Sequence, residues 1–171
     1  EAGKTDARII VFCGVHFMAE TAAIISPDKK ILIPASGAGC SLAESITGYE
    51  LREWKKANPD GIIVSYVNTT AEVKAWTDIC CTSANALKVV QSIPPDRKIL
   101  FVPDKNLGAW IRKVTGREME LWHGDCCVHE RITTDMILEK SRDYPQADIL
   151  IHPESHCSHD EAILNLPQAY M

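Results

Sequence analysis

The sequence matches itself at two long offsets, so the fold must contain related structural units. At an offset of 68 residues Cys13 aligns with Cys81, and at an offset of 86 residues Cys40 aligns with Cys126. Internal similarity at a long period indicates one supersecondary unit that is used repeatedly. Equivalent positions of such units can converge on a shared centre, so Cys40 and Cys126 are candidates for a common ligand. We interpret Cys13 and Cys81 as a packing pair at a strand-to-helix turn.

The two offsets differ by 18 residues, and one insertion in the second copy accounts for the difference. We place this insertion at about residues 104–121, where Lys105-Asn106-Leu107-Gly108 opens an extra segment. For residues 162–171 we predict neither a strand nor a helix, and we expect the chain to be truncated at both ends. The predicted units are the end of a first α/β unit (1–38), a complete second unit (39–125) and the beginning of a third (126–171).

Short apolar runs rich in β-branched residues alternate with segments of helical periodicity, and these runs predict strands and helices in turn. Thr47 followed by Glu50 predicts a capping box at the start of the second helix. The alternation is typical of three-layer α/β units with mainly parallel sheets. The predicted strands are 7–12, 30–34, 62–67, 98–102 and 149–151. The predicted helices are 15–25, 48–57, 71–76, 84–91 and 134–142.

Polar side chains follow two of the predicted strands at matching positions. The offset of 86 residues places Tyr66 opposite His152 and Asn68 opposite Glu154. Tyrosine and asparagine can form hydrogen bonds with a substrate, histidine can hold a carboxylate, and glutamate can act as a general base. Such a set suits a small acid with several functional groups. The alternative is that loops at strand ends are solvated and carry polar residues without any function.

Thr82 and Ser83 precede a predicted helix that begins at Ala84. Their hydroxyl groups, with the free N–H groups of that helix end, would bind a carboxylate or a phosphate. The alternative is that they only cap the helix.

The seven cysteines are an odd number, which disfavours a closed disulfide framework and favours metal or redox use. Cys40 and Cys126 lie in loops with small neighbours that allow close approach to a metal, and iron–sulfur clusters take thiolate ligands. Inert packing is the alternative for any one cysteine. A third alternative is a zinc site built from His156, Cys157 and His159, although this set lacks a fourth ligand.

The net charge of the chain limits its partners, and the distribution of its apolar residues limits its location. The formal net charge is -5 and there is no basic run, so we expect no nucleic-acid partner. No apolar run approaches the roughly 18 residues that a membrane span requires, and residues 1–6 do not resemble a secretory signal. We therefore expect a cytoplasmic protein without a membrane partner.

Seven stretches in a fixed order give the sequence its resemblance to a known family. They include Cys126-Cys127-Val128-His129 and His152-Pro153-Glu154, and the chain closely resembles quinolinate synthase, an iron–sulfur enzyme of NAD biosynthesis. The other stretches are residues 14–22, 38–43, 66–71, 81–86 and 103–108.

The resemblance implies three similar α/β domains around a pseudo-threefold axis, with a central [4Fe-4S] cluster that has one open iron. Cys40 and Cys126 match two of the three cluster ligands, whereas Cys127 matches no functional residue and the third ligand is not identifiable in this chain. Tyr66, Asn68, Ser83 and His152 match substrate-binding residues. Glu154 matches an acid/base glutamate, and we assign a catalytic role to His152 as well.

The family condenses iminoaspartate with dihydroxyacetone phosphate to form quinolinate, with loss of phosphate and water. An aspartate oxidase or dehydrogenase would supply the iminoaspartate. The alternative function is that of a non-catalytic fragment or binding domain, which keeps the fold but lacks the cluster.

Overall fold

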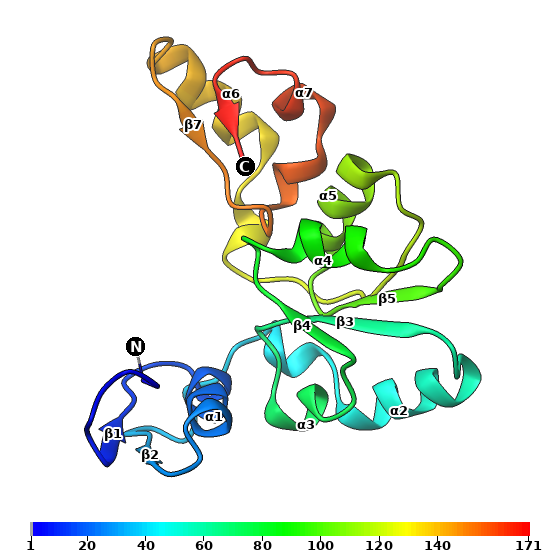
Figure 1. Cartoon of the computed structure of the whole chain (residues 1–171). Helices are drawn as coiled ribbons and strands as arrows, with labels where there is room; N and C mark the ends of the chain where they lie inside the picture. The colour runs from blue at the N-terminus through cyan, green and yellow to red at the C-terminus, as the bar shows by residue number, and fades with distance from the viewer. Residues whose placement is uncertain (1) are drawn as a thin grey trace.

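The computed structural model of the protein describes residues 2–171, in which short strands alternate with helices (Figure 1). The strands are β1 (Ile9–Val11), β2 (Lys30–Leu32), β3 (Ile62–Tyr66), β4 (Ile79–Cys81), β5 (Ile99–Val102), β6 (Glu120–Leu121), β7 (Ile149–Leu150) and β8 (Ala169–Tyr170). The α-helices are α1 (His16–Ile25), α2 (Gly48–Ala57), α3 (Ala71–Lys74), α4 (Ala86–Ser92), α5 (Lys105–Thr115), α6 (Thr134–Asp143) and α7 (Glu161–Leu164). Three short 3₁₀ helices are η1 (Ala43–Ser45), η2 (His129–Arg131) and η3 (His156–His159).

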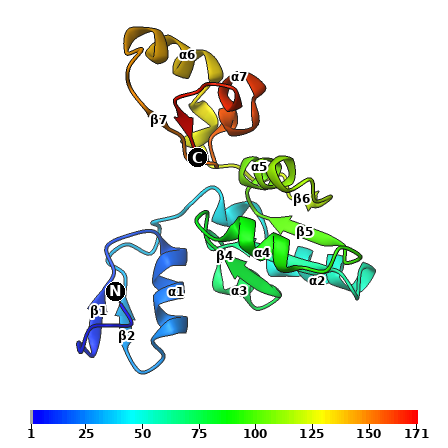
Figure 2. The ribbon, with the colours of Figure 1, turned by 45° about the horizontal axis from the view of Figure 1, so that its top comes forward.

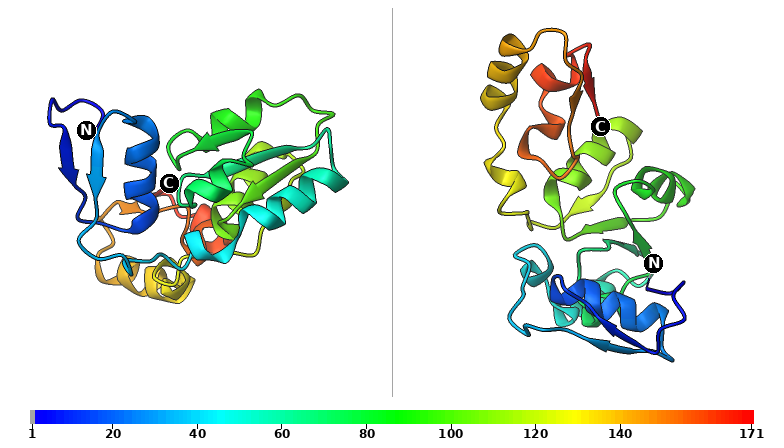
Figure 3. Two further views of the ribbon diagram at one scale, coloured as in Figure 1. Left: turned by 90° about the horizontal axis from the view of Figure 1, so that it is seen from below. Right: turned by 90° about the vertical axis from the view of Figure 1, so that its left-hand side faces the viewer.

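The strands of the described residues form three sheets, and every strand pair is parallel. The central sheet has the order β4-β3-β5-β6, and the pairs β1-β2 and β7-β8 form two smaller sheets. The N-terminal and C-terminal sheets lie on different sides of the central one (Figures 2 and 3). The prediction of an α/β fold with parallel sheets is therefore confirmed.

The central sheet is covered on both faces. Helices α4 and α5 lie on one face and α2 and α3 on the other (Figure 1). Val64 and Phe101 belong to the apolar cluster beneath α4 and α5, and Ile63 and Leu100 belong to the cluster beneath α2 and α3. Because successive strand residues point to opposite faces, β3 and β5 supply both clusters. This burial makes the central sheet the rigid base on which the site is built.

The two segments that follow Cys40 and Cys126 have the same local structure. The amide of Glu44 donates to the carbonyl of Cys40 at 3.0 Å, and the amide of Glu130 donates to the carbonyl of Cys126 at 2.9 Å. A 3₁₀ turn follows in each case, and then a threonine caps the next helix. The predicted capping box of Thr47 and Glu50 is confirmed at α2, and Thr133 caps α6 in the equivalent position.

The predicted insertion contains a regular helix, which the sequence comparison overlooked. Helix α5 has 11 residues and begins after Asp104, whose side chain accepts a hydrogen bond from the amide of Leu107 at 2.6 Å. Leu107 and Ile111 are four residues apart and fully buried, so they anchor one face of the helix in the core. The segment is therefore part of the central unit and supports its sheet.

Three further predictions were wrong. Helix α4 begins at Ala86 and not at Ala84, because Asn85 Oδ1 accepts the amide of Thr82 at 2.6 Å and holds the preceding residues in a turn. Residues 162–171 contain most of α7 and all of β8, which pairs with β7. Cys81 is buried, but Cys13 is exposed and cannot be a packing residue.

Among residues 2–171, no helix combines the length and the apolar character that crossing a membrane requires.

Candidate functional site

A buried carboxylate lies where the central unit meets the C-terminal residues. Glu154 follows β7 and is 3% exposed, and its Oε1 atom accepts a hydrogen bond from the hydroxyl group of Tyr66. Tyr66 is the last residue of β3, so its ring is fixed by the central sheet. Tyr66 and Glu154 are thus in direct contact, whereas the repeat had aligned Tyr66 with His152 and Asn68 with Glu154.

Two histidines flank the same carboxylate. His129 Nδ1 lies 3.2 Å from Glu154 Oε2, and His152 Nδ1 lies 3.7 Å from Glu154 Oε1. The two imidazole rings are stacked, with centroids 5.1 Å apart and planes 6° apart. The carboxylate therefore has a hydroxyl group and two imidazoles around it. This set can hold a small acid and transfer protons.

His129 was not predicted as a site residue. It lies in the stretch 126–129 with Cys126, and the spacing Cys-x-x-His was the sequence signal for a metal ligand. Ligand atoms of Cys126, His129 and Glu154 lie within 4.8 Å of one another. Across residues 2–171, no other set of three histidine, cysteine or carboxylate ligands is as close. A candidate metal site therefore adjoins the buried carboxylate.

The loops of the two predicted ligand cysteines are neighbours. The amide of Cys127 donates to Ser41 Oγ at 3.4 Å, which joins the residue after Cys126 to the residue after Cys40. Cys40 and Cys126 are free thiols of intermediate exposure, and Cys127 is exposed. Two accessible thiols on adjacent loops are a donor set that fits one side of an iron–sulfur cluster.

The first turn of α5 ties these loops together. Asn106 is 1% exposed, and its Nδ2 donates to the carbonyl of Glu154 at 3.1 Å and to Glu130 Oε2 at 3.0 Å. Lys105 Nζ contacts Asp125 Oδ2 at 2.9 Å and Glu130 Oε1 at 3.1 Å. Lys105 and Asn106 belong to the stretch 103–108, to which the sequence analysis assigned no role. They hold the Glu154 loop and the Cys126 loop in one position.

Burial controls the protonation of two groups beside the carboxylate. Burial, with hydrogen bonding to Glu154, raises the pKa of Tyr66 far above its ordinary value, so the hydroxyl keeps its proton and remains a donor. Burial also raises the pKa of Asp104 to about 7, and the negative charges of Glu154 and Asp125 act in the same direction. Hydrogen bonds from the amides of α5 oppose this rise.

The remaining predicted residues lie at the same edge of the central sheet. The hydroxyl group of Ser83 acts to lower the pKa of Tyr66 and partly offsets its rise, so Ser83 lies near Tyr66. Its predicted setting at a helix N-terminus is wrong, because α4 begins three residues later. Asn68 is half-buried just beyond β3, and its side-chain amide makes no hydrogen bond within residues 2–171.

The alternative zinc site in the tail is not formed. Cys157 is fully buried in an apolar cluster with Ile151 and Ile163. His156 Nδ1 lies 3.3 Å from Glu130 Oε1, and within residues 2–171 these tail residues do not gather as ligands.

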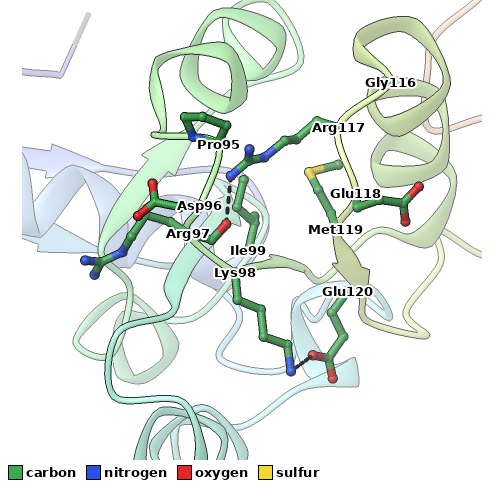
Figure 4. A pocket seen from close by; sticks show the side chains of 10 residues that line it. All are labelled: Pro95, Asp96, Arg97, Lys98, Ile99, Gly116, Arg117, Glu118, Met119 and Glu120. Atoms are coloured by element: carbon green, nitrogen blue, oxygen red, sulfur yellow. Dashed lines mark hydrogen bonds and ion pairs between the residues drawn. The ribbon is translucent and has the colours of Figure 1, made fainter.

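An open pocket of about 520 Å³ lies at the opposite end of the central sheet (Figure 4). Arg117 Nη2 donates to the carbonyl of Arg97 at 2.7 Å there, and Lys98 pairs with Glu120 at 2.9 Å (Figure 4). These groups pair with one another, and the pocket contains none of the predicted site residues.

Comparison with known proteins identifies similar sequences over most of the chain. The family model described as "NadA: Quinolinate synthetase A protein" matches residues 1–166. A quinolinate synthase of Pyrobaculum aerophilum is 54% identical over 168 residues, which are 98% of this chain and 54% of the relative. Relatives of the same name from Mycobacterium sp. (strain KMS) and Synechocystis sp. are 60% and 54% identical over 92% and 90% of this chain, and it covers 47% and 48% of them. The chain thus spans about half the length of these curated relatives.

Proposed function

Because the chain belongs to the quinolinate synthase family, we propose that it contributes to the condensation of iminoaspartate with dihydroxyacetone phosphate, which yields quinolinate with loss of phosphate and water. The observation that carries the proposal is the convergence of Tyr66, Glu154 and Cys126. It brings a hydrogen-bond donor, a buried acid/base and a candidate cluster thiol to one place.

The iminoaspartate part of the substrate binds at the edge of the central sheet. Ser83 and Asn68 offer a hydroxyl group and a side-chain amide that can donate to its carboxylates, and the half-buried side-chain amide of Asn68 makes no hydrogen bond within residues 2–171. Tyr66 keeps its proton and donates, and His152 is exposed enough to meet a ligand directly. The substrate class is therefore a small dicarboxylate.

Glu154 removes and returns protons during the condensation. Its carboxylate is shielded from water, and Tyr66 and His129 hold its two oxygen atoms in fixed directions. A shielded and oriented carboxylate is an efficient general base. His152 lies against the same carboxylate and relays the proton to solvent.

Cys40 and Cys126 would hold a [4Fe-4S] cluster through their thiolates, and their donor chemistry fits this role. When bound, the cluster supplies a Lewis-acidic iron that assists the loss of water. Cys157 is buried in an apolar cluster, so we do not assign the third thiolate of a pseudo-threefold arrangement of units to it. The units within this chain are residues 1–38, 39–125 and 126–171.

The same proposal extends to the supply of substrate. Iminoaspartate comes from an aspartate oxidase or dehydrogenase, and the reaction takes place in the cytoplasm. Seven free cysteines support a reducing compartment.

Quinolinate formation tests the proposal. The chain is fused to the part of the Pyrobaculum relative that it does not cover, and quinolinate is measured under anaerobic conditions after cluster reconstitution. We expect turnover that Glu154→Gln abolishes, whereas the exposed control Glu139→Gln retains it. Full turnover by Glu154→Gln, or no turnover by a fusion protein that carries its cluster, would overturn the proposal.

A further inference from the structure

We infer that Cys126, His129 and Glu154 form a binding site for one zinc(II) ion in the chain that carries no cluster, with a fourth coordination position open. This site differs from the proposed cluster site in its ligands. It combines one sulfur, one nitrogen and one oxygen atom, and it does not use Cys40.

The separation of the ligand atoms fits a shared ion. Zinc takes histidine nitrogen and carboxylate oxygen at roughly 2.0–2.2 Å, so two such ligands of one tetrahedral ion lie about 3.3–3.5 Å apart. His129 Nδ1 and Glu154 Oε2 are already 3.2 Å apart. The thiol of Cys126 completes the set within 4.8 Å and lies three residues before His129 at the entry to η2.

The surroundings hold the ligands in place. The hydroxyl group of Tyr66 binds the second oxygen of Glu154, and the ring of His152 stacks on His129 and fixes its plane. Outer groups of this kind orient the ligands of metal sites. The carbonyl of Glu154 is fixed in turn by Asn106, so the carboxylate loop has little freedom to move away.

The charge around Glu154 favours a cation. Within residues 2–171, this buried carboxylate forms no ion pair with a lysine or an arginine, and its only basic neighbours are His129 and His152. Lys105 is engaged by Asp125 and Glu130 instead. A zinc ion would neutralise the carboxylate and the thiolate together, because the thiol of Cys126 loses its proton on binding.

The site has a consequence for cluster assembly. The zinc ion and the cluster would both require the thiolate of Cys126, so a zinc ion bound there would compete with cluster formation. This competition rests on the proposed function, whereas the zinc site itself does not. Its open fourth position would be filled by water or by a substrate oxygen.

Cobalt(II) is the spectroscopic probe that tests the site. The reduced 171-residue chain is titrated anaerobically with cobalt(II), followed by displacement with zinc(II). We expect one ion per chain, a thiolate-to-cobalt charge-transfer band, and the intense visible bands of a tetrahedral ion. Cys126→Ser should remove the charge-transfer band, and His129→Ala should weaken cobalt binding at least about tenfold. Circular dichroism of each variant verifies that it is folded.

Three control variants test whether cobalt binding is specific to the proposed ligands. Cys40→Ser, Cys127→Ser and His156→Ala should bind cobalt as the parent does. Loss of the band in Cys40→Ser, its persistence in Cys126→Ser, or the absence of tetrahedral cobalt in the folded parent would overturn the zinc site. Loss of the charge-transfer band in Cys40→Ser would not contradict the proposed function, because the proposed cluster requires both Cys40 and Cys126.

Discussion

Replacement of Asn106 by leucine tests whether the first turn of α5 holds the site together. Leucine has the same number and branching of side-chain heavy atoms, although its methyl groups are bulkier, so the variant leaves no cavity and removes the two hydrogen bonds of Nδ2. The carbonyl of Glu154 then lies buried without this partner, which costs about 1–3 kcal/mol. Glu130 is partly exposed and retains Lys105, so its loss adds up to about 1 kcal/mol. We expect Asn106→Leu to lower the free energy of unfolding by about 1–4 kcal/mol.

Urea unfolding followed by tryptophan fluorescence measures this difference. Lys105→Met removes two partly exposed ion pairs from the adjacent position and should cost only about 0–1 kcal/mol. Asn165→Leu changes an exposed asparagine and serves as the control for the substitution itself. A loss below about 0.5 kcal/mol for Asn106→Leu, or a larger loss for Lys105→Met, would refute the reasoning.

Three further predictions concern buried groups. Tyr66→Phe removes a hydrogen bond to a buried carboxylate and should lower the free energy of unfolding by about 2 kcal/mol in the same assay, and an unchanged urea midpoint would contradict the account. The folded state keeps the proton of Asp104 up to about pH 7, whereas its ordinary pKa is 3.8, so this group makes stability fall as pH rises from about 4 to about 7. Asp104→Asn should remove that fall, worth about 4 kcal/mol, and urea midpoints at several pH values that decline in parallel with the parent would count against it. Burial raises the pKa of Cys81 to about 12, so iodoacetamide at pH 8 should label the exposed Cys13 and spare Cys81, and peptide mass spectrometry that finds both labelled would disprove this.

The sequence predicted the elements whose signals are local. Thr47 and Glu50 lie three residues apart and form their capping box without help from distant residues. Tyr66 and Glu154 were identified in a different way, because the repeat placed Tyr66 opposite His152 and Asn68 opposite Glu154 after equivalent strands. That match assigned both residues to functional positions, but the hydrogen bond between them is known only from the structure.

Other features depend on contacts that no local pattern reveals. Strand β8 has two residues and exists because it pairs with β7, about twenty residues earlier in the chain. A single histidine such as His129 does not indicate a function by itself. Only the fold brings its Nδ1 to 3.2 Å from Glu154 Oε2. Helix α5 had a local signal in Asp104, Leu107 and Ile111, but the repeat alignment treated this segment as an insertion and concealed it.

The iron and acid-labile sulfide content of cysteine variants tests the central claim most directly. The fusion protein described above is reconstituted anaerobically, and the parent is compared with Cys40→Ser, Cys126→Ser and Cys127→Ser. We predict about four irons and four sulfides in the parent and in Cys127→Ser, and neither in stoichiometric amount in the other two variants. A full cluster in Cys126→Ser together with its loss in Cys127→Ser would contradict the account.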